Sequence, residues 1–76
     1  MQSEREPIKE RRRSANFAVS AFIRRTRCDH EDAVADLLCD LRHLCDAYPD
    51  FFGTWADNTE RAAMHYRDEI TAANKD

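Results

Sequence analysis

Seventy-six residues are enough for one small domain, and a chain of this size buries only about 60% of the surface that its unfolded form exposes. One Gly and two Pro accompany 42% hydrophobic and 36% charged residues, a composition that favours helices with short connections over a sheet with many turns. The formal net charge is −3, but residues 1–27 carry a balance of +5 and residues 28–76 one of −8. This asymmetry indicates interactions with charged partners rather than a particular fold.

The cysteines and the N-terminal segment predict a cytoplasmic location. Three cysteines without paired spacing, Cys28, Cys39 and Cys45, argue against a disulfide framework. Residues 1–13 are too charged for a signal peptide, and the apolar run at 17–23 is far shorter than the roughly 20 residues of a membrane helix. We therefore expect no membrane segment.

Residues 1–7 are expected to form a flexible lead-in, and residues 8–76 a single helical domain. In the segment 8–27 two patterns compete. A strand is indicated by the alternation of Phe17, Val19, Ala21 and Ile23. A helix is indicated by one apolar stripe at three- and four-residue steps, made of Ile8, Ala15, Ala18, Val19, Phe22 and Ile23. We predict the helix, because arginine and alanine are good helix formers and a lone strand in so short a chain has no obvious partner.

The second predicted helix, over residues 30–48, has the clearest pattern. Asp29 can cap its N-terminus, and the charges of Glu31 and Asp32 suit the helix dipole there. Pro49 disfavours helical geometry at Tyr48 and ends the run. The apolar residues share one face over four turns: Val34, Leu37, Leu38, Leu41, Leu44, Cys45 and Tyr48.

A connection with Phe51 and Phe52 follows, and we expect these rings to plug the open end between the helices. The third helix is predicted over 54–73, starting either at Thr54 or at Asp57, which has capping-box spacing to Glu60. Its small residues should let the leucines of the second helix fill the gap beside it. One side of this helix carries Trp55, Thr59, Ala62, Ala63, Tyr66 and Ile70. The predicted fold is therefore an all-α three-helix bundle over about 8–27, 30–48 and 54–73.

Metal binding is not favoured by the spacing of the potential ligands. Cys39 and His43 lie four residues apart on one helix, where two side chains can hold one ion. Cys28, beside His30, lies roughly 16 Å from Cys39 along the helix axis, and the distances match no familiar zinc pattern. We interpret Cys45 as a small core residue and His43 as solvated, and expect no metal and no other cofactor.

Catalysis is not favoured either. A magnesium-dependent hydrolase would need carboxylates that converge from two helices, and nothing in the spacing pairs Asp36 and Asp40 with the acidic residues of the third helix. A solvated acidic face is the simpler interpretation. The sequence has no Gly-rich phosphate loop, and no Ser or Cys has a recognisable base beside it. We expect no enzyme and no catalytic residues.

A basic and aromatic face is predicted on the first helix. Arginine clusters can neutralise phosphates, but they can also solubilise a helix and pair with the acidic half of the chain. We favour the second interpretation, because nucleic-acid-binding domains are normally basic overall. Phe17 lies off the main apolar stripe, and it either covers the edge of the core or contacts a partner. The candidate contact residues on this face are Arg13, Phe17, Arg24 and Arg27.

One segment carries a resemblance. Residues 36–46 read Asp-Leu-Leu-Cys-Asp-Leu-Arg-His-Leu-Cys-Asp, and Ala62 and the pair His65-Tyr66 follow. This pattern resembles that of small proteins encoded on phages, plasmids and integrated elements, except that Phe51, Phe52 and Trp55 replace a single Phe. The resemblance covers about residues 11–70. It implies three helices and a mobile-element setting, and it carries no known activity. In the predicted fold we expect His43 and His65 to hydrogen-bond between helices.

In size and character the chain is also similar to anti-CRISPR proteins, which are short, frequently acidic and non-enzymatic. Such proteins bind large RNA-guided complexes, for example a type I CRISPR interference complex. These complexes hold nucleic acid in Lys/Arg channels, so exposed carboxylates can occupy the places of phosphates. The candidate residues for this contact are Asp36, Asp40, Asp46, Glu60 and Asp68.

The resulting hypothesis is a phage or mobile-element protein that binds a host protein or ribonucleoprotein complex in the cytoplasm of the host bacterium. The alternative is a nucleic-acid-associated accessory or regulatory protein that uses the arginines around residues 11–13. The thin core and Phe17 at a helix edge favour self-association to a homodimer.

Overall fold

The computed structural model describes residues 6–74 and is helical almost throughout. Its elements are α1 (Glu6–Thr26), α2 (His30–Ala47), the short α3 (Pro49–Phe52) and α4 (Trp55–Asn74). The predicted all-α fold with three long helices is confirmed, and the helical interpretation of residues 17–23 is confirmed because no strand occurs in the described range. Residues 1–5 of the predicted lead-in lie outside that range, and Glu6 and Pro7 already belong to α1.

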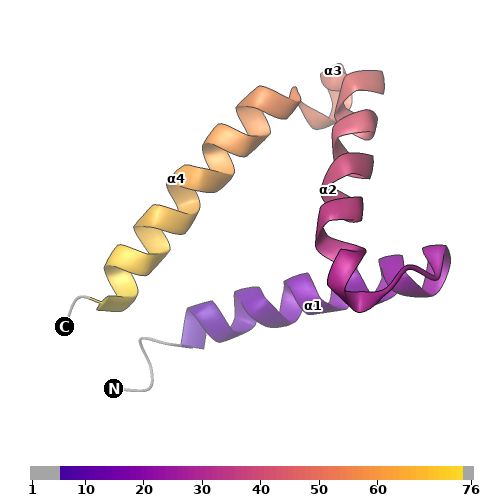
Figure 1. Cartoon of the computed structure of the whole chain (residues 1–76). Helices are drawn as coiled ribbons and strands as arrows, with labels where there is room; N and C mark the ends of the chain where they lie inside the picture. Colours follow the sequence, from indigo (N-terminus) through magenta and orange to yellow (C-terminus); the bar gives the residue numbers. More distant parts are fainter. Residues whose placement is uncertain (1–5, 75–76) are drawn as a thin grey trace.

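The three long helices lie along the sides of a triangle (Figure 1). The first turns of α2 lie against α1, and α3 reverses the chain at the far end of α2. From there α4 returns at an angle to α2, so that its last turns come near the first turns of α1. The bundle is therefore an open one, closed at its corners rather than along its helices.

The corner between α1 and α2 is a short connection with a left-handed residue. Arg27 has φ of 63° and donates its backbone N–H to the carbonyl of Ile23 at 2.7 Å, which ends α1 as an αL cap does. The Thr26 hydroxyl accepts the N–H of Cys28 at 3.4 Å. Asp29 occupies the N-cap position of α2 as predicted, but its side chain makes no capping hydrogen bond. The predicted acidic first turn of α2 is present in Glu31 and Asp32.

The corner between α2 and α4 is built around Gly53 and Asn58. Gly53 has φ of 88° and ψ of 167°, a conformation that is essentially restricted to glycine. The Asn58 Nδ2 donates to the carbonyls of Phe52 at 3.0 Å and Thr54 at 2.9 Å, and lies 3.6 Å from the Cys45 Sγ. The Thr54 hydroxyl accepts the N–H of Asp57 at 3.1 Å. The start of α4 at residue 55 therefore agrees with the Thr54 alternative and not with Asp57.

The core is much smaller than the sequence pattern predicts. Ala33 and Cys45 are the buried hydrophobic residues of the described range, as expected for Cys45. The expectation that leucines of α2 fill the gap beside Ala62 and Ala63 is wrong, since these alanines are exposed. The reason is that α4 diverges from α2 beyond the α3 corner (Figure 1). The following residues of α2 and its C-cap are left exposed, and we call them the α2 apolar face: Val34, Leu38, Leu41, Leu44 and the C-cap residue Tyr48.

Candidate binding surfaces

The α2 apolar face is the largest group of exposed apolar side chains on one helix. Its members recur at three- and four-residue steps and therefore form one stripe, with Leu41 at its middle. Leu41 is 39% exposed, and Leu37 beside it is half-buried. Large apolar side chains clustered in this way mark surfaces for contact with a protein, a membrane or a ligand.

The two aromatic residues of α3 do not plug the corner, contrary to the prediction. Phe51 is 81% exposed, and Phe52 is also exposed. Their rings meet edge to face, with centroids 4.7 Å apart and an interplanar angle of 84°, which is a favourable geometry for an aromatic pair. Both side chains of the four-residue α3 are therefore exposed, and the corner is held instead by the Asn58 amide, which lies near the Cys45 Sγ and donates to the Phe52 carbonyl.

The predicted basic and aromatic face lies on the side of α1 that points away from α2. Phe17 is 74% exposed, and it lies about 180° around the helix from Ile8, the start of the apolar stripe. Arg13 precedes Phe17 by one turn and forms an exposed ion pair with Glu10 at 2.7 Å. Arg24 follows two turns after Phe17, whereas Arg27 lies beyond the helix end. Arg13, Phe17 and Arg24 therefore share one face, and Arg27 does not continue it.

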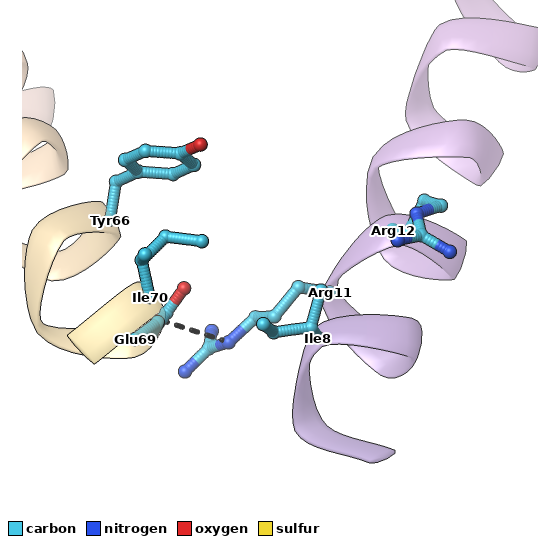
Figure 2. A pocket seen from close by; sticks show the side chains of 6 residues that line it. All are labelled: Ile8, Arg11, Arg12, Tyr66, Glu69 and Ile70. Carbon is cyan, nitrogen blue, oxygen red and sulfur yellow. Dashed lines mark ion pairs between the residues drawn. The ribbon is translucent and has the colours of Figure 1, made fainter. Parts of the chain in front are cut away.

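A groove lies where the last turns of α4 approach the first turns of α1 (Figure 2). The Arg11 Nε lies 3.2 Å from the Glu69 Oε2 and joins the two helices across it. Both side chains are partly solvated, so this pair contributes at most about 1 kcal/mol. The groove is lined by Ile8, Arg11, Arg12, Tyr66, Glu69 and Ile70. Periodicity placed Ile8 and Ile70 on apolar stripes, but nothing in the sequence indicated that the two helix ends meet.

The predicted acidic residues are exposed but do not gather at one point. Asp36 and Asp40 border a shallow depression at the corner of α1 and α2, together with Phe22, Thr26, Cys28 and Cys39. Glu60 borders a separate depression on α4 with Asp57, Arg61 and Met64. Asp46 and Asp68 are exposed elsewhere on α2 and α4.

The histidines and cysteines do not form a joint site in the described part of the chain. Cys39 and His43 are both exposed on α2, and no group of three or more His, Cys, Asp or Glu within residues 6–74 is arranged to hold a metal ion. His43 and His65 are exposed. The expected hydrogen bond between them is not formed, because α2 and α4 diverge.

The comparisons with known proteins add no relative. No family model matches the chain, and neither a curated protein nor a solved structure is detectably similar to it. Within residues 6–74, none of the helices has the length and apolar character needed to cross a membrane.

Proposed function

We propose that this chain is a non-enzymatic phage or mobile-element protein that acts by binding a host protein complex. The observation that carries the proposal is the exposure of Phe17 between two arginines on the outer face of α1. A phenylalanine that is 74% exposed on a helix gains little free energy from folding of the chain itself. Aromatic and arginine side chains are enriched in the residues that contribute most binding energy at protein interfaces.

The finer proposal is an anti-CRISPR-like inhibitor that occupies a nucleic-acid-binding surface of a type I interference complex. The exposed carboxylates of Asp36 and Asp40, one helical turn apart on α2, support it. A Lys/Arg channel that holds phosphates attracts such carboxylates by the same Coulomb interaction. In this proposal Phe17 and its arginines supply binding energy, and the carboxylates compete with nucleic acid.

The test is co-purification of the chain with a type I interference complex from a matching host, followed by a gel assay of target-DNA binding. We expect the chain to abolish DNA binding, and Phe17→Ser to weaken association by about 30-fold, because a hot-spot aromatic contributes about 2 kcal/mol or more. Phe51→Ser is the matched control, since Phe51 is still more exposed but lies on α3. No association at micromolar concentration with any such complex would contradict the proposal.

A second candidate function is nucleic-acid binding through the first turns of α1. The observation that favours it is a basic depression bordered by Lys9, Arg12, Arg13 and Asn16. Replacement of Arg11, Arg12 and Arg13 by Ala should then abolish a salt-sensitive gel shift with duplex DNA. Each arginine–phosphate contact adds about one unit to the slope of the logarithm of the binding constant against the logarithm of the salt concentration. Binding that persists in this triple variant would exclude the candidate.

A further inference from the structure

We propose that a second copy of this chain covers the α2 apolar face, so that the folded unit is a homodimer. This goes beyond the binding of a host complex, which uses the outer face of α1. Four observations carry the inference: the surface area of the single chain, its dimensions, the distribution of its charges, and the bonds that hold the α3 corner open.

The single chain exposes more surface than a folded monomer of its size. It exposes 6560 Å², whereas a monomer of 8.9 kDa exposes about 4,800 Å². The seven residues outside the described range account for at most about 1,300 Å² at the rate of an unfolded chain, and a compact monomer of the other 69 residues exposes about 4,500 Å², so an excess of about 800 Å² remains. A stable interface buries about 800 Å² on each partner. The excess is therefore of the size that one dimer interface removes from solvent.

The dimensions agree with the surface area. The Cα radius of gyration is 14.7 Å, compared with about 11 Å for a compact domain of this length. The molecule measures 42 × 28 × 18 Å along its principal axes. It is therefore more extended than a compact domain of its length, and a second copy packed on the α2 apolar face reduces this excess.

The charge distribution also favours a partner that carries both a basic and an acidic segment. Residues 1–27 carry +5 and residues 28–76 carry −8, yet one ion pair, Arg11 with Glu69, joins these two segments among the described residues. A second copy presents an acidic segment to arginines that lie off the outer face of α1, such as Arg12, and a basic segment to the carboxylates of α4. A twofold interface makes each of these contacts twice.

The alternative occupant of the α2 apolar face is α4 of the same chain. The α3 corner opposes this closure, because the direction of α4 is held by Asn58 through its bonds to the carbonyls of Phe52 and Thr54. Rotation of α4 onto α2 would break the bond to Phe52, the last residue of α3, and the Arg11–Glu69 pair at the other end. We therefore assign the face to a second copy rather than to a closed monomer.

Sedimentation equilibrium of the purified 76-residue chain tests the inference. Between about 1 and 100 µM we expect a mass twice the 8.9 kDa of one chain. The melting temperature should rise with protein concentration, because folding and association are linked. A compact 8.9 kDa monomer at the highest concentration, with a melting temperature independent of concentration, would overturn the proposal.

Two matched variants locate the interface. Leu41→Glu places a charge at the middle of the α2 apolar face, and we expect its dimer dissociation constant to rise at least 100-fold. Met64→Glu is the control, since Met64 is 45% exposed, compared with 39% for Leu41. Met64 belongs to α4 and not to the α2 apolar face, and it lies about 160° around α4 from Tyr66, which lines the groove toward α1. If Leu41→Glu stays as dimeric as Met64→Glu, the face is wrongly assigned. Because no host complex is present, this outcome leaves the binding role of Phe17 untouched, and failure of the Phe17 test leaves the dimer untouched.

Discussion

Replacement of Gly53 by Ala is expected to lower the stability of the protein by about 2–3 kcal/mol, because an L-residue is strained at a φ of 88° and a ψ of 167°. The added Cβ would also lie 3.1 Å from the Asn58 Nδ2 and press on the amide that holds the corner. In a domain of this size the melting temperature should fall by more than about 10 °C. Thermal unfolding followed by circular dichroism at a fixed protein concentration measures the change.

A chain with D-alanine at position 53, made by chemical ligation, is the control for this prediction. The mirror-image residue favours positive φ, so it should keep the corner and fold at least as well as the glycine chain. If L-alanine and D-alanine give the same melting temperature, the positive φ of Gly53 does not determine the stability of this corner.

The second large effect is expected for Asn58→Ala, which removes the side chain that ties α3 to the start of α4. The carbonyls of Phe52 and Thr54 then lose a donor at 3.0 and 2.9 Å, respectively. We expect the free energy of unfolding to fall by about 1–2 kcal/mol. Asn58→Asp should be at least as damaging, because an ionised carboxylate cannot donate to a carbonyl. Chemical denaturation at pH 7 compares the three chains.

Thr59→Ala is the matched control, one residue further along α4. The Thr59 hydroxyl bonds only to carbonyls of its own helix, at Trp55 and Ala56, and alanine is the better helix former. Its free energy of unfolding should therefore change by less than about 0.5 kcal/mol. Equal losses in Asn58→Ala and Thr59→Ala would mean that the bonds across the corner contribute nothing specific.

The helices could be predicted from the sequence because their signals are local. Spacing of apolar residues and Pro49 placed the ends of α2 within one residue of 30–47. Pro49 was read correctly as the end of α2, but not as the first residue of α3, a position where proline also fits because its missing N–H has no partner there. Two capping signals competed at the start of α4, and Thr54 was shown to be the cap only by its bond to Asp57.

The arrangement of the helices could not be predicted in the same way. Periodicity says which face of α2 is apolar, but not what covers it, so Leu38, Leu41 and Leu44 were wrongly placed in a core. The direction of α4 depends on Gly53 and Asn58, and an amide side chain in a first helical turn carries no sequence signal for bonds to α3. The candidate face around Phe17 was found because Phe17 lies off the apolar stripe of its own helix, and this is a local signal in the sequence.

The position of Trp55 gives the α3 corner an intrinsic optical reporter. It is the sole tryptophan of the chain, stands two residues after Gly53 at the start of α4, and is half-buried. Its fluorescence therefore senses polarity beside the pivot of α4, whereas far-ultraviolet ellipticity senses helix content. A shift in emission without a loss of ellipticity, on dilution or on adding a target, would register a swing of α4 in the unlabelled protein.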